Sequence, residues 1–421
     1  MPNIRIENVR AKADADAPQA SSWKRLESSG DTLAPLETRG DYESGYTVYS
    51  GTFSTVADGL LKTDYYFDDW HSVLIDGKAV PGLTGIGKEN ISGTKIPAGT
   101  HSIEVIYENQ GWPNGGNMEE HKGLKSISFS HAAGIERLDT WKHARTPSPV
   151  PGNDPREASA SYDDAQWSTV TVGNGTQSFI QPDQGWWFRT HLTISNEALS
   201  EHASLTFGAV DDNALVYVDG KLAVTHKGYD APFTIQLDGL ARKGDNVIAV
   251  YVENQGGGGG IWKPVVFRWG SSVPLKIEMR IHHSLDGALA GWDKPAFKDS
   301  DWKTSKNWTA VRSEDGITWY RGNFTVPSKS GWVIPWRLHF ISTGSAQIWI
   351  NGRLLGRYSS RGPQEDFYLP DGWLNMNGKN SVAFVVRPGA DGNESPVIKE
   401  AYVAPYREYI VQKHELTVTT K

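Results

Sequence analysis

The sequence predicts an all-β protein made of three tandem antiparallel β-sandwiches of the jelly-roll type. Three short sequence phrases recur in the same order along the 421 residues. The copies lie 132 to 145 residues apart, which is too long for a solenoid repeat and fits homologous domains of ordinary size. Long helical periodicity is almost absent, so strands are expected to fill each unit.

The first recurring phrase is an aromatic segment at the start of a predicted strand. It reads Tyr-Thr-Val-Tyr-Ser-Gly-Thr-Phe at 46–53, Trp-Trp-Phe-Arg-Thr-His-Leu at 186–192 and Trp-Tyr-Arg-Gly-Asn-Phe at 319–324. Aromatic and β-branched residues are enriched in strands because they pack well on a pleated surface. Each copy is therefore expected to begin a strand.

The second phrase is an apolar run that ends in a tight turn. Asp76, Asp219 and Asn351 each follow such a run, and each is followed by glycine. Asp-Gly and Asn-Gly pairs favour type I′ turns, in which both central residues need a positive φ angle. We predict a β-hairpin at each of the three positions.

The third phrase is a β-rich run that follows a short turn. Its copies cover 102–111, 246–256 and 381–386, and the first two end in Glu-Asn-Gln-Gly. Apolar and polar residues alternate in the first copy, which places one face of the strand inward and the other outward. Taken together, the repeats predict domains at residues 1–134, 135–272 and 273–421, each large enough to bury a core.

The composition excludes several classes of protein and site. The chain has no cysteine, which excludes disulfide scaffolds, thiolate zinc sites, iron–sulfur clusters and cysteine nucleophiles. Its net charge of −7 argues against a nucleic-acid partner, and the absence of an apolar run of roughly 20 residues argues against a membrane span. The first residues show no apolar signal core, so the compartment stays open: cytoplasmic, or extracellular or periplasmic if a targeting segment was removed.

Three longer motifs resemble a known family. Residues 348–358 read Ile-Trp-Ile-Asn-Gly-Arg-Leu-Leu-Gly-Arg-Tyr, and Gly-Pro-Gln and Tyr-Leu-Pro follow at 362–364 and 368–370. Residues 107–117 read Tyr-Glu-Asn-Gln-Gly-Trp-Pro-Asn-Gly-Gly-Asn, and 291–302 read Gly-Trp-Asp-Lys-Pro-Ala-Phe-Lys-Asp-Ser-Asp-Trp. In this order they resemble the accessory jelly-roll, galactose-binding-like domains of the β-galactosidases of glycoside hydrolase family 35.

The resemblance implies a part in carbohydrate metabolism, but it supplies no catalytic residue. Members of the family begin with a (β/α)₈ barrel that carries two catalytic glutamates. A barrel needs eight strand–helix alternations over roughly 250 residues, and three sandwiches already fill this sequence. No position here corresponds to the catalytic pair, and Ser359 stands where the family often has Trp.

Carboxylates and histidines give no separate indication of catalysis. Hydrolysis of a glycosidic bond by a retaining enzyme needs two carboxyl groups about 5 Å apart. Glu108 and Glu253 both precede Asn-Gln-Gly, which favours a shared strand ending over a catalytic role. His282 and His283 are neighbours on a strand and would point to opposite faces, so they cannot easily share a metal. No cofactor is predicted, although pairs of aspartates such as Asp211 and Asp212 could support a structural Ca²⁺.

Carbohydrate binding is the better supported chemistry. The C–H faces of sugars stack on Trp and Tyr rings, and planar amides match pairs of hydroxyl groups. The loops after the third phrase combine both kinds of group in two domains. The candidate residues are Asn109, Gln110, Trp112, Asn114 and Asn117 in the first domain, and Asn254, Gln255 and Trp262 in the second. The alternative is that Trp112 and Trp262 cover the end of a sandwich or an interface between domains, which also favours Trp.

The sequence therefore predicts an accessory, non-catalytic subunit or region of a β-galactosidase-like glycoside hydrolase. It would support a partner chain that carries the (β/α)₈ barrel, and its ligand would be a β-galactoside or a related glycan. Two alternatives stay open. The chain could be a stand-alone carbohydrate-binding module, or a glycoside hydrolase with a site of its own between domains.

Overall fold

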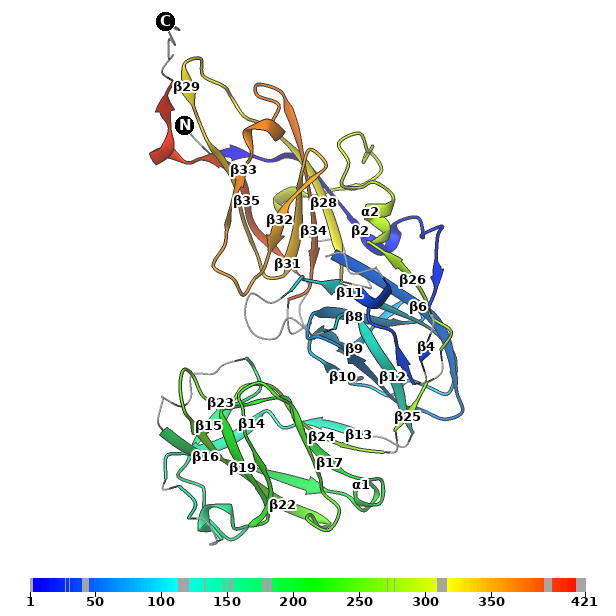
Figure 1. Ribbon diagram of the computed structural model, residues 1–421, viewed down its shortest axis with the longest axis vertical. Helices are drawn as coiled ribbons and strands as arrows, with labels where there is room; N and C mark the ends of the chain where they lie inside the picture. The colour runs from blue at the N-terminus through cyan, green and yellow to red at the C-terminus, as the bar shows by residue number, and fades with distance from the viewer. Residues whose placement is uncertain are drawn as a thin grey trace, which may run out of the picture.

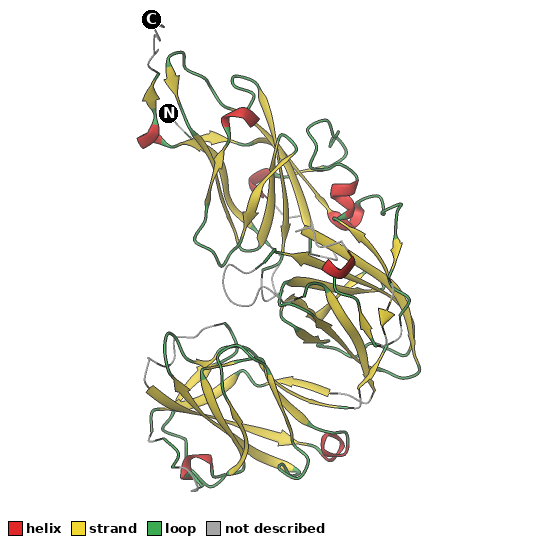
Figure 2. Ribbon diagram, in the orientation of Figure 1, coloured by secondary structure: helices red, strands yellow, loops and turns green. Residues whose placement is uncertain are grey.

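A computed structural model of the chain describes residues 3–26, 28–29, 31–39, 45–112, 121–131, 134–146, 148–150, 154–175, 180, 184–270, 272–275, 277–308, 316–389 and 396–413. The regular structure in these ranges is almost entirely antiparallel β-strand (Figure 2). The predicted all-β class is confirmed. Three β-sandwiches follow one plan, each with a six-stranded and a four-stranded sheet.

Sandwich 2 is continuous in sequence and shows the plan most simply. Its six-stranded sheet consists, in spatial order, of β15 (Ser168–Thr171), β14 (Thr140–Ala144), β16 (Gln184–Ile194), β22 (Gly244–Asn254), β19 (Asn213–Val218) and β20 (Lys221–His226). Its four-stranded sheet consists of β13 (Gly134–Arg137), β24 (Val265–Trp269), β17 (Ser204–Phe207) and β21 (Phe233–Gln236). The short pair β18 (Val210–Asp211) and β23 (Gly260–Ile261) lies beside them, with η3 (Arg156–Ala158) and α1 (Asn196–Ser200) in the connections.

Sandwich 1 repeats the plan with strands from two distant parts of the chain. Its six-stranded sheet consists of β3 (Lys24–Arg25), β26 (Arg280–His283), β6 (Gly45–Thr55), β11 (Gly99–Asn109), β8 (Trp70–Ile75) and β9 (Lys78–Ile86). Its four-stranded sheet consists of β10 (Glu89–Ile91), β7 (Gly59–Tyr65), β12 (Leu124–His131) and β25 (Ser272–Pro274). The pair β4 (Ser28–Ser29) and β5 (Thr32–Leu33) and the turn η2 (Glu37–Arg39) complete it.

Sandwich 3 also takes strands from both ends of the described chain. Its six-stranded sheet consists of β27 (Lys303–Thr304), β2 (Glu7–Ala13), β28 (Thr318–Thr325), β34 (Lys379–Arg387), β31 (Ser345–Ile350) and β32 (Arg353–Tyr358). Its four-stranded sheet consists of β1 (Ile4–Arg5), β35 (Ile398–Pro405), β30 (Trp336–Ser342) and β33 (Asp366–Leu369). The remaining elements are η1 (Asp14–Asp16), α2 (Asp286–Leu289), η4 (Lys306–Trp308), β29 (Trp332–Val333), η5 (Asp371–Trp373), η6 (Arg407–Tyr409) and β36 (Val411–Gln412).

Sandwiches 1 and 3 exchange their first strands. In sandwich 2 the strand beside β16 is β14, which precedes it in sequence. The same place beside β6 in sandwich 1 is taken by the late strand β26, and the place beside β28 in sandwich 3 is taken by the early strand β2. Figure 1 shows β2, in blue, among the yellow and orange strands of sandwich 3. The predicted domain limits, which follow order along the chain, do not include this exchange.

The predicted hairpins form at all three turns. The φ angles of Asp76, Asp219 and Asn351 are 50°, 46° and 50°, and the glycine after each also has a positive φ, as a type I′ turn requires. A side-chain oxygen of each residue also accepts a hydrogen bond from a backbone N–H of the neighbouring strand, at Ser102, Val247 and Ser381. The second and third sequence phrases are therefore joined by the same contact in every sandwich.

The six-stranded sheets of sandwiches 1 and 3 pack on each other through an apolar layer. Trp70 and Leu74 of sandwich 1 lie in one buried cluster with Trp319 and Val385 of sandwich 3. Trp349 of the same sheet stacks on Trp319 with 5.3 Å between ring centroids, and it packs, half-buried, against this cluster. The corresponding outer face of sandwich 2 is covered by its own residues, among them Ala158 and Trp167. Sandwich 2 takes no part in the layer between sandwiches 1 and 3, and Figure 1 shows it, in green, to one side of them.

Candidate functional site

The predicted loop of sandwich 1 is held mainly through its backbone. Asn109 is buried, and its Oδ1 accepts a hydrogen bond from the Gly111 N–H. The Gln110 N–H donates to Asp69, and the Gln110 carbonyl accepts from Arg357 of sandwich 3. The amide of Asn109 thus stabilises the loop, while the Gln110 side chain is exposed. Asn114 and Asn117 lie outside the described residues.

Trp112 lies above a buried ion pair. Its side chain is 43% exposed, and the Lys122 ammonium lies 5.9 Å from its ring centroid and 3.3 Å from that of Phe67. Lys122 also donates to Asp69, 2.9 Å away, and both charged side chains are buried. Burial raises the pKa of Asp69, against the opposite effect of the Lys122 charge. Among the described residues, Trp112 therefore combines a cationic neighbour, Lys122, with a partly exposed ring.

The predicted loop of sandwich 2 is built in a similar way. Asn254 is fully buried; its Nδ2 donates to the carbonyls of Ile180 and Gly257, and its Oδ1 accepts from the Gly256 N–H. The Gln255 N–H donates to Asp212, and the Gln255 side chain is exposed. Asn254 is therefore committed to holding the glycine-rich loop.

Trp262 is half-buried and fixes another loop. Its indole Nε1 donates to the Tyr229 carbonyl at 2.9 Å, and the Lys263 ammonium lies 4.6 Å from its ring centroid. This bond holds the backbone of the β20–β21 loop while the Tyr229 side chain remains 63% exposed. Trp262 therefore fixes the backbone of the residue that carries the exposed Tyr229 ring.

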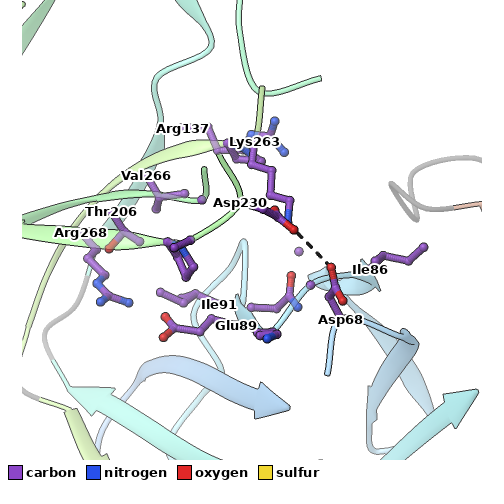
Figure 3. Close-up of a pocket in the computed structure, with 18 of the residues that line it drawn as sticks. Asp68, Ile86, Glu89, Ile91, Arg137, Thr206, Asp230, Lys263, Val266 and Arg268 are labelled. Atoms are coloured by element: carbon purple, nitrogen blue, oxygen red, sulfur yellow. Dashed lines mark ion pairs between the residues drawn. The ribbon is translucent and has the colours of Figure 1, made fainter. Parts of the chain in front are cut away.

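A cavity of about 890 Å³ lies between sandwiches 1 and 2 (Figure 3), and none of the six predicted residues that the structure describes is among those that line it. Its volume falls in the range of typical small-molecule sites. Sandwich 1 contributes residues of the β7–β8 loop, β9, β10 and their turn, and sandwich 2 contributes residues of β13, β17, β24 and the β20–β21 loop. The functional side chains among them are Phe67, Asp68, Lys88, Glu89, Asn90, Arg137, Thr206, Tyr229, Asp230, Lys263 and Arg268.

An ion pair spans the cavity. The Lys263 ammonium lies 2.6 Å from Asp230 of its own sandwich and 3.8 Å from Asp68 of sandwich 1, as the dashed line in Figure 3 shows. Glu89 on the wall pairs with Lys62, whereas Arg268 donates to the Ser204 hydroxyl. Arg137 donates to Asp139 through two nitrogens. The cavity therefore combines fixed charge pairs with amide, hydroxyl and aromatic groups.

Asn90 is the wall residue whose orientation is best defined. His71 lies fully buried below it, and burial lowers the pKa of His71 to about 3, so its ring is neutral. The ring Nδ1 faces the Asp69 carbonyl, which can only accept, so Nδ1 carries the proton. Nε2 must then accept from the Asn90 Nδ2, 2.7 Å away. The amide oxygen of Asn90 is turned away from His71.

Four carboxyl groups singled out by the sequence, Glu108, Glu253, Asp211 and Asp212, are each engaged by neighbouring residues. Glu108 is buried and paired with Arg387 at 2.5 Å, while Glu253 accepts a hydrogen bond from Asn213. Burial raises the pKa of Asp211 to about 7, and a hydrogen bond with Asp212 adds to the rise. Two carboxyl groups bonded to each other leave no space for a glycosidic oxygen between them.

Among the described residues, no three His, Asp or Glu side chains gather in a way that could hold a metal ion. The structural Ca²⁺ considered from the aspartate pairs stays a prediction. Within those same residues no helix is long and apolar enough to cross a membrane.

Sequence reasoning missed several groups at this site. Asn90 and Lys263 carry no local motif, and Asp68 belongs to one of the aspartate pairs, which suggested a cation and not a sugar. The arrangement of sandwich 2 beside sandwich 1 brings the three residues to one cavity. The repeat gives one indirect signal for the cavity: it places Trp262, the residue before Lys263, in a loop at the end of a sandwich.

The comparisons with known proteins point to one group of enzymes. Residues 317–380 match the family described as "Beta-galactosidase, galactose-binding domain". "Probable beta-galactosidase A" of Emericella nidulans is 36% identical over 96 residues, which cover 21% of this chain and 9% of that protein. "Beta-galactosidase A" of Aspergillus oryzae is 23% identical over 351 residues, which cover 68% of this chain and 33% of that protein.

These matches confirm the predicted resemblance to the non-barrel domains of β-galactosidases. The chain spans about a third or less of the length of both relatives. Among solved structures, Bacteroides uniformis β-glucuronidase 2 overlaps with a TM-score of 0.28 at 14% identity, over 66% of this chain and 31% of that one. The family match lies wholly in sandwich 3 and includes neither predicted loop.

Proposed function

We propose that this chain, which carries a β-galactosidase galactose-binding domain at residues 317–380, is a non-catalytic part of a family-35-like β-galactosidase. It supports a partner chain that carries the (β/α)₈ barrel, and it binds carbohydrate. The observation that carries the proposal is the match over 68% of the chain to one third of a β-galactosidase, in a chain whose described parts are three sandwiches.

The engagement of the carboxyl groups supports a non-catalytic role. Glu108 neutralises a buried arginine between two sandwiches, and removing it for proton transfer would leave Arg387 buried and unpaired. Asp211 and Asp212 share a hydrogen bond instead of facing each other across a space. These contacts favour the accessory role over a hydrolase that would use Glu108, Asp211 or Asp212 as its catalytic groups.

Two measurements test the proposal. The purified chain should release no chromophore from nitrophenyl β-galactosides. The tagged chain recovered from its native host should carry a second chain of barrel size, together with β-galactosidase activity. Turnover by the chain alone that survives further purification would contradict the non-catalytic role, and recovery of the chain with no barrel-bearing partner would contradict the supporting role.

A further inference from the structure

We propose that the cavity between sandwiches 1 and 2 is a binding site for a neutral galactoside, with Asn90 as its fixed polar group and Tyr229 as its stacking ring. The galactoside class rests on the proposed function. The place of the site does not, because the matched galactose-binding segment lies in sandwich 3 and the cavity is lined by sandwiches 1 and 2.

The walls carry the groups that a sugar needs. Tyr229 offers an exposed aromatic face, and its backbone is held in place by Trp262. Such a face stacks on the C–H surface of a pyranose ring. Gly228, next to Tyr229 on the wall, has open space where a Cβ would stand, so a hydroxyl group could approach its backbone closely.

Asn90 supplies a recognition group that is oriented before the ligand arrives. His71 Nε2 holds the amide Nδ2, so the amide oxygen is available on the side away from the histidine. A flexible asparagine would lose rotational freedom on binding, whereas this amide has already lost it on folding. His71 does not touch the cavity and is therefore a positioning residue.

The charges on the walls favour a neutral ligand over a polyanion. Lys263 is shared by Asp68 and Asp230, and Arg137 is paired with Asp139. Arg268 is the wall cation whose printed partner is a hydroxyl group, that of Ser204. An acidic polysaccharide would have to displace these carboxylates, while a neutral sugar can accept and donate hydrogen bonds beside them.

Calorimetric titration of the whole chain with lactose and with galactobiose tests the site. The protein should come from a bacterial host, because Asn90-Ile91-Ser92 is also a glycosylation sequon. Asn90→Ala should weaken binding about tenfold, the value of one well-placed hydrogen bond, and Tyr229→Ala by a similar factor. Asn196→Ala, an exposed asparagine in α1, should bind as the unaltered chain does, and Tyr229→Phe should stay within about twofold.

A second pair of variants tests the positioning role. His71→Phe keeps a ring against Tyr65 but has no nitrogen to hold Asn90, and it should weaken binding about three- to tenfold. His71→Gln retains an acceptor and should recover most of the affinity. Equal affinities for these two variants would overturn the role of His71.

The outcomes separate this inference from the proposed function. A chain that binds neither disaccharide at millimolar concentration, yet assembles with a barrel-bearing chain, overturns the site alone. Binding that is unaffected by both Asn90→Ala and Tyr229→Ala also overturns the site. Binding of polygalacturonate without binding of either disaccharide would assign the cavity to an acidic polysaccharide. Binding with the expected losses, in a chain that assembles with no barrel, would overturn the proposed function and leave the site standing.

Discussion

Glu108, Glu253 and Arg387 occupy corresponding positions near the ends of β11, β22 and β34, yet they meet different surroundings. In sandwich 2, Glu253 is exposed. In sandwiches 1 and 3 the corresponding residues have opposite charges and face each other across the interface, where Gln347 also donates to Glu108. The sequence identified the shared strand ending correctly, but the pairing depends on how two sandwiches pack.

We expect Glu108→Ala to lower the free energy of unfolding by about 3–5 kcal/mol, because it leaves the buried Arg387 guanidinium without its counter-charge. Glu253→Ala is the matched control and should cost less than about 0.5 kcal/mol. Urea unfolding followed by tryptophan fluorescence measures both. Equal effects of the two substitutions would mean that the ion pair does not stabilise the interface.

The predicted sugar-binding amides show where residue-scale prediction stops. Asparagine and glutamine are candidates because amides match sugar hydroxyl groups. The side chains of Asn109 and Asn254, however, form hydrogen bonds with the protein backbone. Composition cannot distinguish an amide that binds a ligand from one that holds a loop. That difference is set by neighbours such as Ile180, which lies 74 residues from Asn254.

The elements themselves were far easier to predict. Asp-Gly and Asn-Gly turns and alternating strands are local signals, and each predicted hairpin forms with the expected positive φ. Which sheet a strand joins is a different matter. Either β2 or β26 could pair with an aromatic strand such as β6 or β28. Periodicity alone does not predict that β2 pairs with β28 of sandwich 3 and β26 with β6 of sandwich 1.

The hairpin turns allow a sharp test at this scale. We expect Asp219→Ala to cost about 1–2 kcal/mol of stability, because alanine tolerates the positive φ poorly and the bond to the Val247 N–H is lost. Asp219→Asn should change the free energy of unfolding little, because Asn351 accepts the equivalent backbone hydrogen bond in sandwich 3. Thermal unfolding of the two variants gives the comparison. A similar loss for both would show that the Asp219 charge, which also pairs with Arg242, matters more than the turn.

For the whole molecule, the number of sandwiches and their internal plan could be predicted from repeats, while their grouping could not. Sandwiches 1 and 3 share a buried tryptophan-rich layer, and sandwich 2 does not take part in it. The reason lies in the outer face of each six-stranded sheet. Sandwich 2 covers its own face with a segment that includes Ala158 and Trp167, and that buried cluster contains no residue of sandwich 1 or 3.

We expect sandwich 2 to be removable. Because Ser130 of β12 pairs with Ser272 of β25, replacing residues 131–271 by Asn-Gly would close a two-residue hairpin between them. The shortened chain should remain folded and unfold cooperatively, as circular dichroism would show. Deleting residues 1–17 instead should destabilise the protein. The deletion removes β2 from the sheet of sandwich 3, and it removes the buried Asp14, which accepts a hydrogen bond from the Trp319 indole. Unfolding of the first variant or full stability of the second would contradict this grouping.

The exchange of first strands also has a consequence for synthesis on the ribosome. Sandwich 2 has all its strands between residues 134 and 269, so it can fold as soon as that stretch has emerged. Sandwich 1 must wait with an open sheet edge until β26 is made, and β1 and β2 must wait for β28 and β35. Unpaired edges attract other chains while they last. The order of translation therefore leaves β1 and β2 without their partner strands until about 300 to 400 further residues have been made.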